Sequence, residues 1–400
     1  MQFNFLHPVK MVFAATLLGM MLTGCDSNDE DDPDGLTSVE GHVFHPVQEQ
    51  ATDQNVAQLK VPANFTVSKF AENLGKPRML AVGSDGQVYF TDRDAGTVTL
   101  LRDTNSDGKS DQSQVVANKP NMHGITIHNN QMYLVTVHEV FSAAINNDGT
   151  LGTLKMLISD LPDAGQHPNR TIAFGPDGKM YITVGSTCNA CAEPNAENAT
   201  ILQANADGSN RKIFASGLRN TIGFGWHPQT QKMYGMDHGI DWLGDREQQE
   251  EVNLLEQGKF YGWPYIYGDG KFNPQPPPED STYEQYLAKT TLPLLQYEAH
   301  SAPLAMVFYT GSQFPSEYQT DAFVAMRGSW NRRDPVGYKV VRLHFENGQP
   351  TRFEDFLTGF LINNNTSHFG RLAGLTVHTD GSLLVSDDTN GVIYRVSYTP

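Results

Sequence analysis

Six copies of one short unit follow each other along the chain, and this repetition limits the possible folds more than any other feature. Each copy has a polar residue, an apolar run, a turn rich in Gly, Asp or Asn, a second apolar run and a loop. The copies cover residues 77–92, 123–139, 169–186, 217–264, 301–328 and 371–388, with turns near 85, 129, 177, 229, 315 and 380. Two apolar runs joined by a tight turn are typical of a β-hairpin, so the chain is predicted to be all-β.

The spacing of the copies predicts how many strands each contributes. Early copies lie about 45–50 residues apart, which is the length of a four-stranded propeller blade. Further apolar runs, such as TVTLLRD after the first copy and GVIYRVSY after the last, supply outer strands. The expected fold is a six-bladed β-propeller of four-stranded antiparallel blades, with residues 65–70 completing the last blade. A β-sandwich with accidental Asp-Gly turns is the weaker alternative, because it does not explain six copies in one phase.

The gap before the fifth copy contains an insertion at about residues 256–299. Its run NPQPPP, residues 273–278, cannot form a central strand because proline has no backbone N–H to donate. The insertion is expected to be a lid or loop on the rim of the propeller.

Residues 1–25 have the features of an export signal. Lys10 precedes an apolar run at 11–21, too short for an ordinary transmembrane helix, and the segment ends in LTGC, which resembles the bacterial lipobox with Cys25 as the lipidated residue. Residues 26–58 begin with DSNDEDDPDG and are expected to be a disordered acidic tether, which leaves 59–400 for the propeller. The chain is predicted to be an exported lipoprotein, anchored by its N-terminal lipid only, on the periplasmic side of a bacterial envelope. A plain secretory signal is the alternative.

Charge and cysteine content exclude some classes of function. The formal net charge of −17 argues against nucleic acid as a partner, because such binding needs a basic surface. An anionic ligand would therefore need a local group of cations. Once Cys25 is lipidated, Cys188 and Cys191 remain as a CxxC pair, which is too few ligands for zinc unless others join and which favours a local disulfide in an exported protein.

The repeat phase predicts which side chains meet. In a blade the innermost strand begins, and the second strand ends, at one mouth of the central channel. The residues before the first strands are Arg78, His123, His167 with Arg170, Arg219 with Asn220, His300 and Arg371. Those after the second strands are Thr91 with Asp92, Gly185 with Ser186, Asp237 with His238, Met326 with Arg327, and Asp387 with Asp388. Cationic, imidazole and carboxylate groups gathered in one concave site predict a pocket for an acidic, metal-bridged ligand.

Several segments carry a resemblance to a known family: GLRN (217–220), DHGIDWLGD (237–245), EEVNLL (250–255), YGWP (261–264), HPNRTIAFGPDGKMYITVG (167–185), RGSWNRRDPVGYKVVRL (327–343) and GRLAGLTVHTDGSLLVSDD (370–388). They resemble the soluble-type sugar dehydrogenases that use pyrroloquinoline quinone (PQQ), in particular the glucose/sorbosone dehydrogenase group. The similarity extends over roughly residues 60–400. It implies a six-bladed propeller with PQQ at one mouth.

The resemblance also implies catalytic roles for individual residues. His167 corresponds to the general base that takes the proton of the substrate hydroxyl while hydride passes to the quinone. Arg219 and Asn220 correspond to the groups that bind the quinone oxygens, and the positive charge of Arg219 would stabilise the negative charge that develops there.

The same resemblance implies residues that hold the cofactor. Gly239 and Ile240 match the positions whose backbone carbonyls bind the Ca²⁺ that bridges protein and PQQ. Arg327 stands where the family has a basic residue against the cofactor, and Arg371 where it has a carboxylate-binding arginine.

One position departs from the family. In glucose-oxidising members an aspartate about one hairpin after the histidine orients it, and here that position is Ser186. A serine can hydrogen-bond the imidazole but does not offset the charge of an imidazolium. Asp177 lies at the far turn and cannot take its place.

A separate acidic loop could hold a second cation. Its oxygen-bearing side chains alternate along residues 103–111, at Asp103, Asn105, Asp107 and Asp111, with a glycine for the turn. Gln114 stands where a calcium loop has its terminal glutamate. The pattern fits either a structural calcium site or an Asx-rich hairpin turn.

The main hypothesis is a PQQ- and calcium-dependent dehydrogenase of a sugar, sugar aldehyde or related alcohol, with an external electron acceptor. One alternative is a calcium-dependent lactonase-like hydrolase propeller, in which rim acids hold a metal that activates water. The other is a non-catalytic lipoprotein that binds a ligand at the propeller mouth. The lactonase-like alternative has no need for Arg219, Arg327 and Arg371 together.

The lipobox hypothesis predicts that Cys25→Ser releases the protein from the membrane fraction, because the thiol that carries the lipid is removed. Immunoblots of membrane and soluble fractions measure the distribution. Continued sedimentation of the variant with membranes would point to a different anchor.

Overall fold

The computed structural model describes residues 41–163, 165–274 and 277–400. By its contacts the chain divides into two units, residues 1–37 and 38–400, and every described element belongs to the second. Cys25, the predicted signal and the first part of the predicted tether lie outside the described residues. No helix among the described residues is both long and apolar enough to cross a bilayer.

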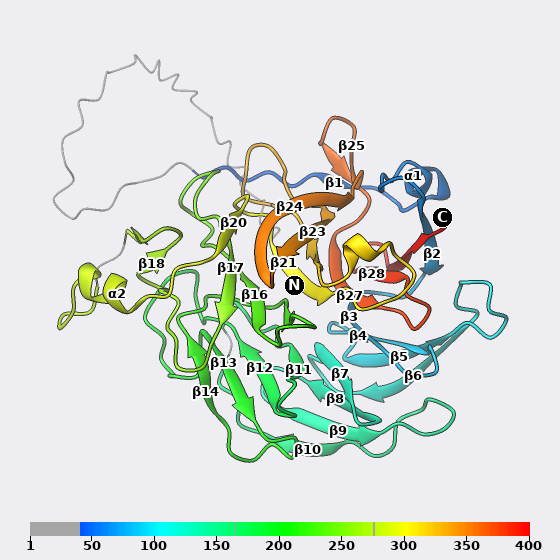
Figure 1. Cartoon of the computed structure of the whole chain (residues 1–400), viewed down its shortest axis with the longest axis horizontal. Helices are drawn as coiled ribbons and strands as arrows, with labels where there is room; N and C mark the ends of the chain where they lie inside the picture. Colours follow the sequence, from blue (N-terminus) through cyan, green and yellow to red (C-terminus); the bar gives the residue numbers. More distant parts are fainter. Residues whose placement is uncertain (1–40, 164, 275–276) are drawn as a thin grey trace, which may run out of the picture. The chain divides into compact units, whose positions relative to one another are not determined.

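The described chain is all-β, with six four-stranded antiparallel sheets that follow one another around the middle of the unit (Figure 1). The first three sheets are β3 (Pro77–Val82), β4 (Val88–Asp92), β5 (Thr97–Arg102) and β6 (Gln112–Asn118); β7 (Gly124–His128), β8 (Gln131–Val135), β9 (Val140–Ala144) and β10 (Lys155–Ile158); and β11 (Ile172–Phe174), β12 (Met180–Val184), β13 (Thr200–Ala204) and β14 (Lys212–Ser216).

The other three sheets are β15 (Phe224–Trp226), β16 (Met233–Asp237), β17 (Glu250–Leu255) and β20 (Leu295–Tyr297); β21 (Pro303–Phe308), β22 (Ala322–Met326), β23 (Lys339–Glu346) and β24 (Gln349–Leu357); and β27 (Leu372–Val377), β28 (Leu383–Asp387), β29 (Val392–Tyr398) and β2 (Phe65–Ala71). All six predicted hairpins are present. As the sequence predicted, β2 completes the last sheet by pairing with β29. The arrangement is consistent with a β-propeller.

Neighbouring sheets bury their apolar faces against each other. Strands such as β12 and β28 are buried at every position, because a sheet lies on both of their sides. Each pair of neighbours shares a core cluster, and the clusters contain, in order around the unit, Met79 with Leu134, Tyr133 with Ile182, Tyr181 with Phe224, Tyr234 with Val324, Phe323 with Leu383, and Leu384 with Leu101. The last sheet therefore also packs against the first.

Buried hydroxyl groups also join the sheets near their inner strands. Thr91 donates to the carbonyl of His123, Thr171 to that of Ile222, and Ser386 to that of Arg78, each at 2.6 Å. These bonds run from the first sheet to the second, from the third to the fourth and from the sixth to the first. Each satisfies a carbonyl that burial would otherwise leave without a donor.

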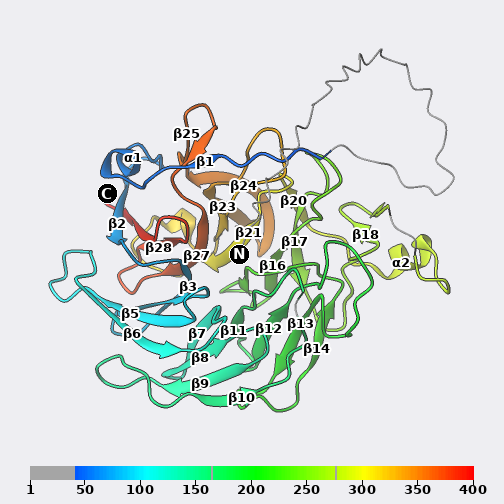
Figure 2. The same cartoon turned by 180° about the vertical axis from the view of Figure 1, so that it is seen from behind.

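The structure corrects the boundary of the predicted tether. Residues 41–58 lie on the sheet unit, although the sequence analysis assigned 26–58 to a disordered segment. β1 (Val47–Gln48) pairs in parallel with β26 (Ser367–His368), which pairs with β25 (Leu361–Ile362). α1 (Asp53–Ala57) begins at the N-cap Thr52, buries Val56 and lies beside β2 (Figure 2). Paired backbone groups and one buried valine are the physical reason that this polar segment is ordered.

The predicted rim insertion is present but shorter than expected. It follows β17 and carries the two-stranded hairpin of β18 (Ile266–Tyr267) and β19 (Lys271–Phe272), and then α2 (Tyr283–Lys289). β20, which the sequence analysis included in the insertion, is the outer strand of the fourth sheet. A short 3-10 helix, Ser316–Tyr318, precedes β22.

The hydroxyl bond that joins the last sheet to the first can be tested by substitution. Ser386 is fully buried, accepts the N–H of Gly374 at 2.7 Å and donates to Arg78. Ser386→Ala leaves both backbone groups buried and unpaired, so the free energy of unfolding should fall by about 2 kcal/mol or more. Guanidinium titrations measure it.

Ser84→Ala is the matched control, because Ser84 is exposed in the turn after β3. This variant should stay within about 0.5 kcal/mol of the parent protein. Equal stability of the two variants would contradict a stabilising role for the Ser386 bond.

Candidate functional site

The strands bring the predicted site residues to one end of the sheets. Because neighbouring strands are antiparallel, the first strand of a sheet begins where its second strand ends. In three sheets the aspartate that ends the second strand accepts backbone N–H groups of the segment before the first. The pairs are Asp92 with Lys76 at 2.9 Å, Asp237 with Arg219 and with Asn220 at 2.8 Å, and Asp387 with Arg371 at 2.9 Å. Burial raises the pKa of Asp387 to about 7.

A connected series of contacts crosses this mouth from the fifth sheet to the third. Its members are Arg327 Nη1 to Asp388 Oδ1 (2.6 Å), Arg78 Nη1 to Asp388 Oδ2 (2.5 Å), Arg78 Nη2 to His123 Nε2 (3.3 Å), His123 Nδ1 to Arg170 O (2.8 Å) and Arg170 Nη1 to His167 O (3.2 Å). The predicted convergence of these residues on one mouth is therefore present in the structure. Asp388 has its pKa lowered to about 2: burial would raise it, but the two guanidinium groups outweigh that effect.

The imidazole ring of His167 is held by hydrogen bonds at its Nδ1 atom. Its Nδ1 lies 2.9 Å from the carbonyl oxygen of Ser186 and 2.8 Å from the Oγ of the same residue. A carbonyl oxygen can only accept, so Nδ1 carries the proton and Nε2 keeps its lone pair. No hydrogen bond to Nε2 is found among the described residues. Burial, followed by the charge of Arg219, lowers the pKa of His167 to about 3, so the imidazole is neutral at ordinary pH.

Arg219 lies close enough to act on this histidine by its charge, and its side chain is 3% exposed. Ser186 connects the two residues, because its N–H donates to the carbonyl of Arg219 at 2.8 Å. Nε of Arg219 donates to Asn189 O (2.9 Å), and Nη2 donates to Asn189 Oδ1 (2.7 Å) and Asp241 Oδ2 (3.0 Å). Nη1 has no acceptor in the described part of the chain and remains for a ligand.

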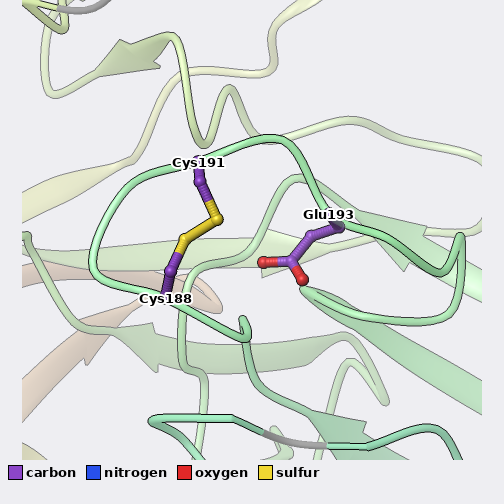
Figure 3. Close-up of side chains that lie close together, drawn as sticks. All are labelled: Cys188, Cys191 and Glu193. Carbon is purple, nitrogen blue, oxygen red and sulfur yellow. A yellow bond between two sulfur atoms is a disulfide. The ribbon is translucent and has the colours of Figure 1, made fainter.

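The loop that holds both residues is closed by a disulfide. Figure 3 shows Cys188 bonded to Cys191, with the carboxylate of Glu193 nearby. The disulfide suggested by the sequence is thus formed, with its Cα atoms 6.1 Å apart. Asn189 lies between the two cysteines, and the carbonyl of Cys188 accepts the hydroxyl of Ser186 at 2.8 Å.

Among the described residues, one group of three potential metal-binding side chains has its ligand atoms within 4.8 Å of one another. Its members are Cys188, Cys191 and Glu193. With both sulfurs in a disulfide, it offers no thiolate to a metal.

Arg327 and Arg371 form a second cationic group at the same mouth. Arg371 donates from Nη2 to Gly328 O at 2.7 Å, but its Nε is buried and has no acceptor in the described chain. Burial, with a further contribution from Arg327, lowers the pKa of Arg371 to about 10. Two neighbouring guanidinium groups, one of them with an unpaired buried N–H, suit an anionic ligand.

The loop with Gly239 and Ile240 is fixed by its amides. The N–H of Gly239 donates to Glu250 and that of Ile240 to Gln248, both at 3.1 Å. No hydrogen bond to either carbonyl oxygen is found among the described residues, so both oxygens remain for a cation. Burial raises the pKa of Glu250 to about 8.

The acidic loop at 103–111 lies between β5 and β6, at the opposite end of the sheets, where it lines a cavity with Gly86 and Asp380. Its carboxylates accept hydrogen bonds of the loop itself, as in Asp103 from the N–H of Gly108 (2.8 Å) and Asp111 from the hydroxyl of Thr104 (2.7 Å). This geometry matches the Asx-rich turn. Calcium bound by Asp103, Asn105, Asp107 and Asp111 stays a prediction.

Three features of the site were not found by sequence reasoning. Asn189 and Asp241 bind Arg219, and a polar residue inside the CxxC loop was the available signal for the first of them. The third feature is the segment 42–49, which lies along the loops of this mouth: Phe44 N–H donates to Trp330 O (3.0 Å) and Gln48 to Thr389 O (3.0 Å).

Comparison with known proteins agrees with this geometry. The profile of the TrAA12-like family matches residues 59–399. An uncharacterized protein of Borreliella burgdorferi is 31% identical over 368 residues, which cover 87% of this chain and 93% of that protein. The PQQ-dependent pyranose dehydrogenase of Coprinopsis cinerea is 24% identical over 406 residues, 85% of this chain and 54% of the relative, so the chain spans about half of that relative.

Solved structures show the same fold. The holo form of the pyranose dehydrogenase PQQ domain from Coprinopsis cinerea has a TM-score of 0.73 and 22% identity, and the match covers 89% of this chain and 100% of that domain. The calcium structure of an AA12-family carbohydrate-active enzyme from Trichoderma reesei has a TM-score of 0.74 and 20% identity, with 85% and 97% covered. The chain therefore belongs to the TrAA12-like family, and its predicted relationship to PQQ-dependent sugar dehydrogenases is confirmed.

Proposed function

We propose that this protein is a PQQ- and calcium-dependent dehydrogenase that oxidises a sugar, sugar aldehyde or related alcohol at the mouth of a six-bladed propeller of four-stranded blades. The observation that carries the proposal is the position of His167, whose Nε2 keeps its lone pair, close enough to the buried side chain of Arg219 to feel its charge. Relatives named as PQQ-dependent sugar dehydrogenases support it.

The residues at the mouth fit a tricarboxylate quinone. Arg371 has a buried Nε without an acceptor, Arg327 stands beside it, and Arg219 keeps Nη1 unpaired among the described residues. Carboxylates satisfy such guanidinium donors with short, charge-assisted bonds. Asn220 would join Arg219 in binding the quinone oxygens. Arg327 and Arg371 would then hold carboxyl groups of PQQ.

The loop around Gly239 and Ile240 fits a hard cation. Its two amides are tied to side chains while its two carbonyl oxygens have no partner in the described chain. Ca²⁺ prefers such oxygen ligands, and a carboxylate of the cofactor could complete its shell.

The chemistry assigned to the chain is proton transfer and charge stabilisation. When bound, PQQ would supply the acceptor for the hydride of the substrate. Nε2 of His167 would take the proton of the substrate hydroxyl, because the bonds at Nδ1 fix the tautomer and the ring. Ser186 takes over the orienting role of the aspartate in glucose-oxidising members, with a carbonyl and a hydroxyl in place of a charge.

No observation favours the hydrolase alternative. A lactonase-like centre needs carboxylates that converge on a metal, and the described residues contain no group of three such side chains apart from the cysteine loop.

We further propose that residues 1–25 direct export, that Cys25 carries the lipid anchor on the periplasmic side, and that electrons leave to an external acceptor.

Reconstitution tests the proposed function. Adding PQQ and Ca²⁺ to the purified protein should give saturable, calcium-dependent PQQ binding and dye reduction with members of a sugar panel. Arg219→Ala should weaken the PQQ affinity about tenfold or more, because a charge-assisted bond to the cofactor is lost. Arg352→Ala, at an arginine 58% exposed on β24, is the control. Lactone hydrolysis without PQQ, or binding without turnover, would contradict the proposal.

The role of His167 predicts a split between turnover and binding. His167→Gln should lower kcat by about 10²- to 10⁴-fold, since the base is removed, while the PQQ dissociation constant changes little. Ser186→Ala should lower kcat by no more than about tenfold, because the carbonyl of residue 186 still accepts the proton of Nδ1. An equal loss of PQQ binding and turnover in His167→Gln would reassign this residue to the cofactor.

A further inference from the structure

A cavity opens at the same mouth, beside the proposed cofactor-binding residue Arg327. Its volume is about 350 Å³, and its lining includes Lys76, Arg78, Arg93, Asn169, Arg327 and Asp388. Asn169 stands two residues after His167, and Arg327 belongs to the proposed cofactor site. The cavity therefore borders the proposed PQQ-binding group, and one lining residue is close in sequence to the proposed base. Gln48 of the N-terminal segment forms another part of its wall.

The lining is cationic although the protein is acidic. Four cationic and two acidic side chains line the cavity, in a chain of net charge −17. One carboxylate, that of Asp388, is shared by Arg78 and Arg327, and Asp94 pairs with Lys76 on the exposed rim. For Arg93 no ion pair or hydrogen bond of the side chain is found among the described residues. The cavity thus keeps a positive charge that the protein does not neutralise.

Two buried polar atoms of the lining also lack partners in the described chain. These atoms are Nε of Arg93, a donor, and Oδ1 of Asn169, an acceptor. A buried donor or acceptor without a partner is destabilising, so a ligand that supplies the missing partner is favoured at this place. A ligand with an anionic group for Arg93 and a hydroxyl for Asn169 would satisfy both atoms.

We infer that this cavity binds the carboxylate or phosphate of an acidic sugar, so that the preferred substrate of the proposed dehydrogenase is an anionic rather than a neutral sugar. That the acidic sugar is oxidised rests on the proposed function, whereas its binding to the cavity does not. A neutral sugar would leave the Arg93 guanidinium desolvated without an anion, which is unfavourable. The three arginines assigned to PQQ and its oxygens, Arg219, Arg327 and Arg371, do not include Arg93.

Two sugars that differ only at one carbon test the inference. D-glucuronate and D-glucose share the same oxidisable anomeric hydroxyl, and D-glucose 6-phosphate adds the phosphate form of the anion. Calorimetric titrations of each sugar are made on the protein as purified and after addition of PQQ and Ca²⁺. D-glucuronate or D-glucose 6-phosphate should bind about tenfold more tightly than D-glucose, and the tighter of the two identifies the anion. The advantage should shrink as NaCl rises from about 50 to about 500 mM.

Substitution of Arg93 assigns the effect to the cavity. Arg93→Gln should remove most of the preference for the acidic sugar, and Arg93→Lys should keep part of it, because the charge remains without the planar fork. Arg352→Gln is the matched control at an exposed arginine outside the lining and should keep the full preference. Thermal melts show whether each variant is folded. A further variant, Lys76→Gln, changes a rim residue that is 59% exposed. It should weaken the preference for the acidic sugar without disturbing the core.

Three results would overturn the inference: equal affinity for D-glucuronate, D-glucose 6-phosphate and D-glucose, an unchanged preference in Arg93→Gln, or a loss of PQQ affinity in Arg93→Gln as large as that in Arg219→Ala. The last would assign the cavity to the cofactor. Absence of dye reduction with every sugar would refute the proposed function instead, and the binding comparison would still decide the inference.

Discussion

The structure depends on one packing constraint: a four-stranded sheet that is apolar on both faces must lie between two other sheets. Fully buried inner strands such as β12 and β28 satisfy it, because neighbouring sheets cover them on both sides. Each buried Val, Leu or Phe side chain contributes about 1.5–3 kcal/mol, so the six shared clusters dominate the stability of the unit. Since every sheet needs two neighbours, the last must pack against the first, and β2 with Ser386 provides that connection.

The same constraint determines where function can reside. Faces occupied by packing are not available to a ligand, so the polar side chains that can meet a ligand lie at the ends of the strands. The carboxylates of Asp92, Asp237 and Asp387 serve the backbone there, each binding the N–H groups that precede the first strand of its sheet. The cationic side chains of those loops are left to face the mouth. An acidic protein thereby obtains a local positive field without a basic surface.

The sequence predicted the parts of the fold that repeat. Turns such as those at Gly86, Gly178 and Gly381, all with φ between 70° and 87°, require glycine, and they recur in phase with the apolar runs. The phase in turn located His167, Arg219 and Arg371 at one mouth. Segment 41–58 was missed because a docked polar segment has no periodic pattern, and its order comes from partners such as Ser367 and His368, far along the chain. The contacts of Asn189 could not be predicted either, since they depend on how the disulfide loop folds over Arg219.

Under the proposed function, a serine at residue 186 in place of an acid leaves His167 its role as base, because other groups of the site can change the pKa of the imidazole. In the structure, burial and then the charge of Arg219 hold the pKa of His167 near 3, which makes it a weak base. An anionic ligand held by Arg219, Arg327 and Arg371 would bring negative charge to the same space and raise that pKa toward its usual range. An aspartate at residue 186 would raise it permanently, whereas a serine and its carbonyl orient the ring and leave the increase to the ligand. Under the proposed function, His167 would therefore become a stronger base when an anionic ligand fills the site.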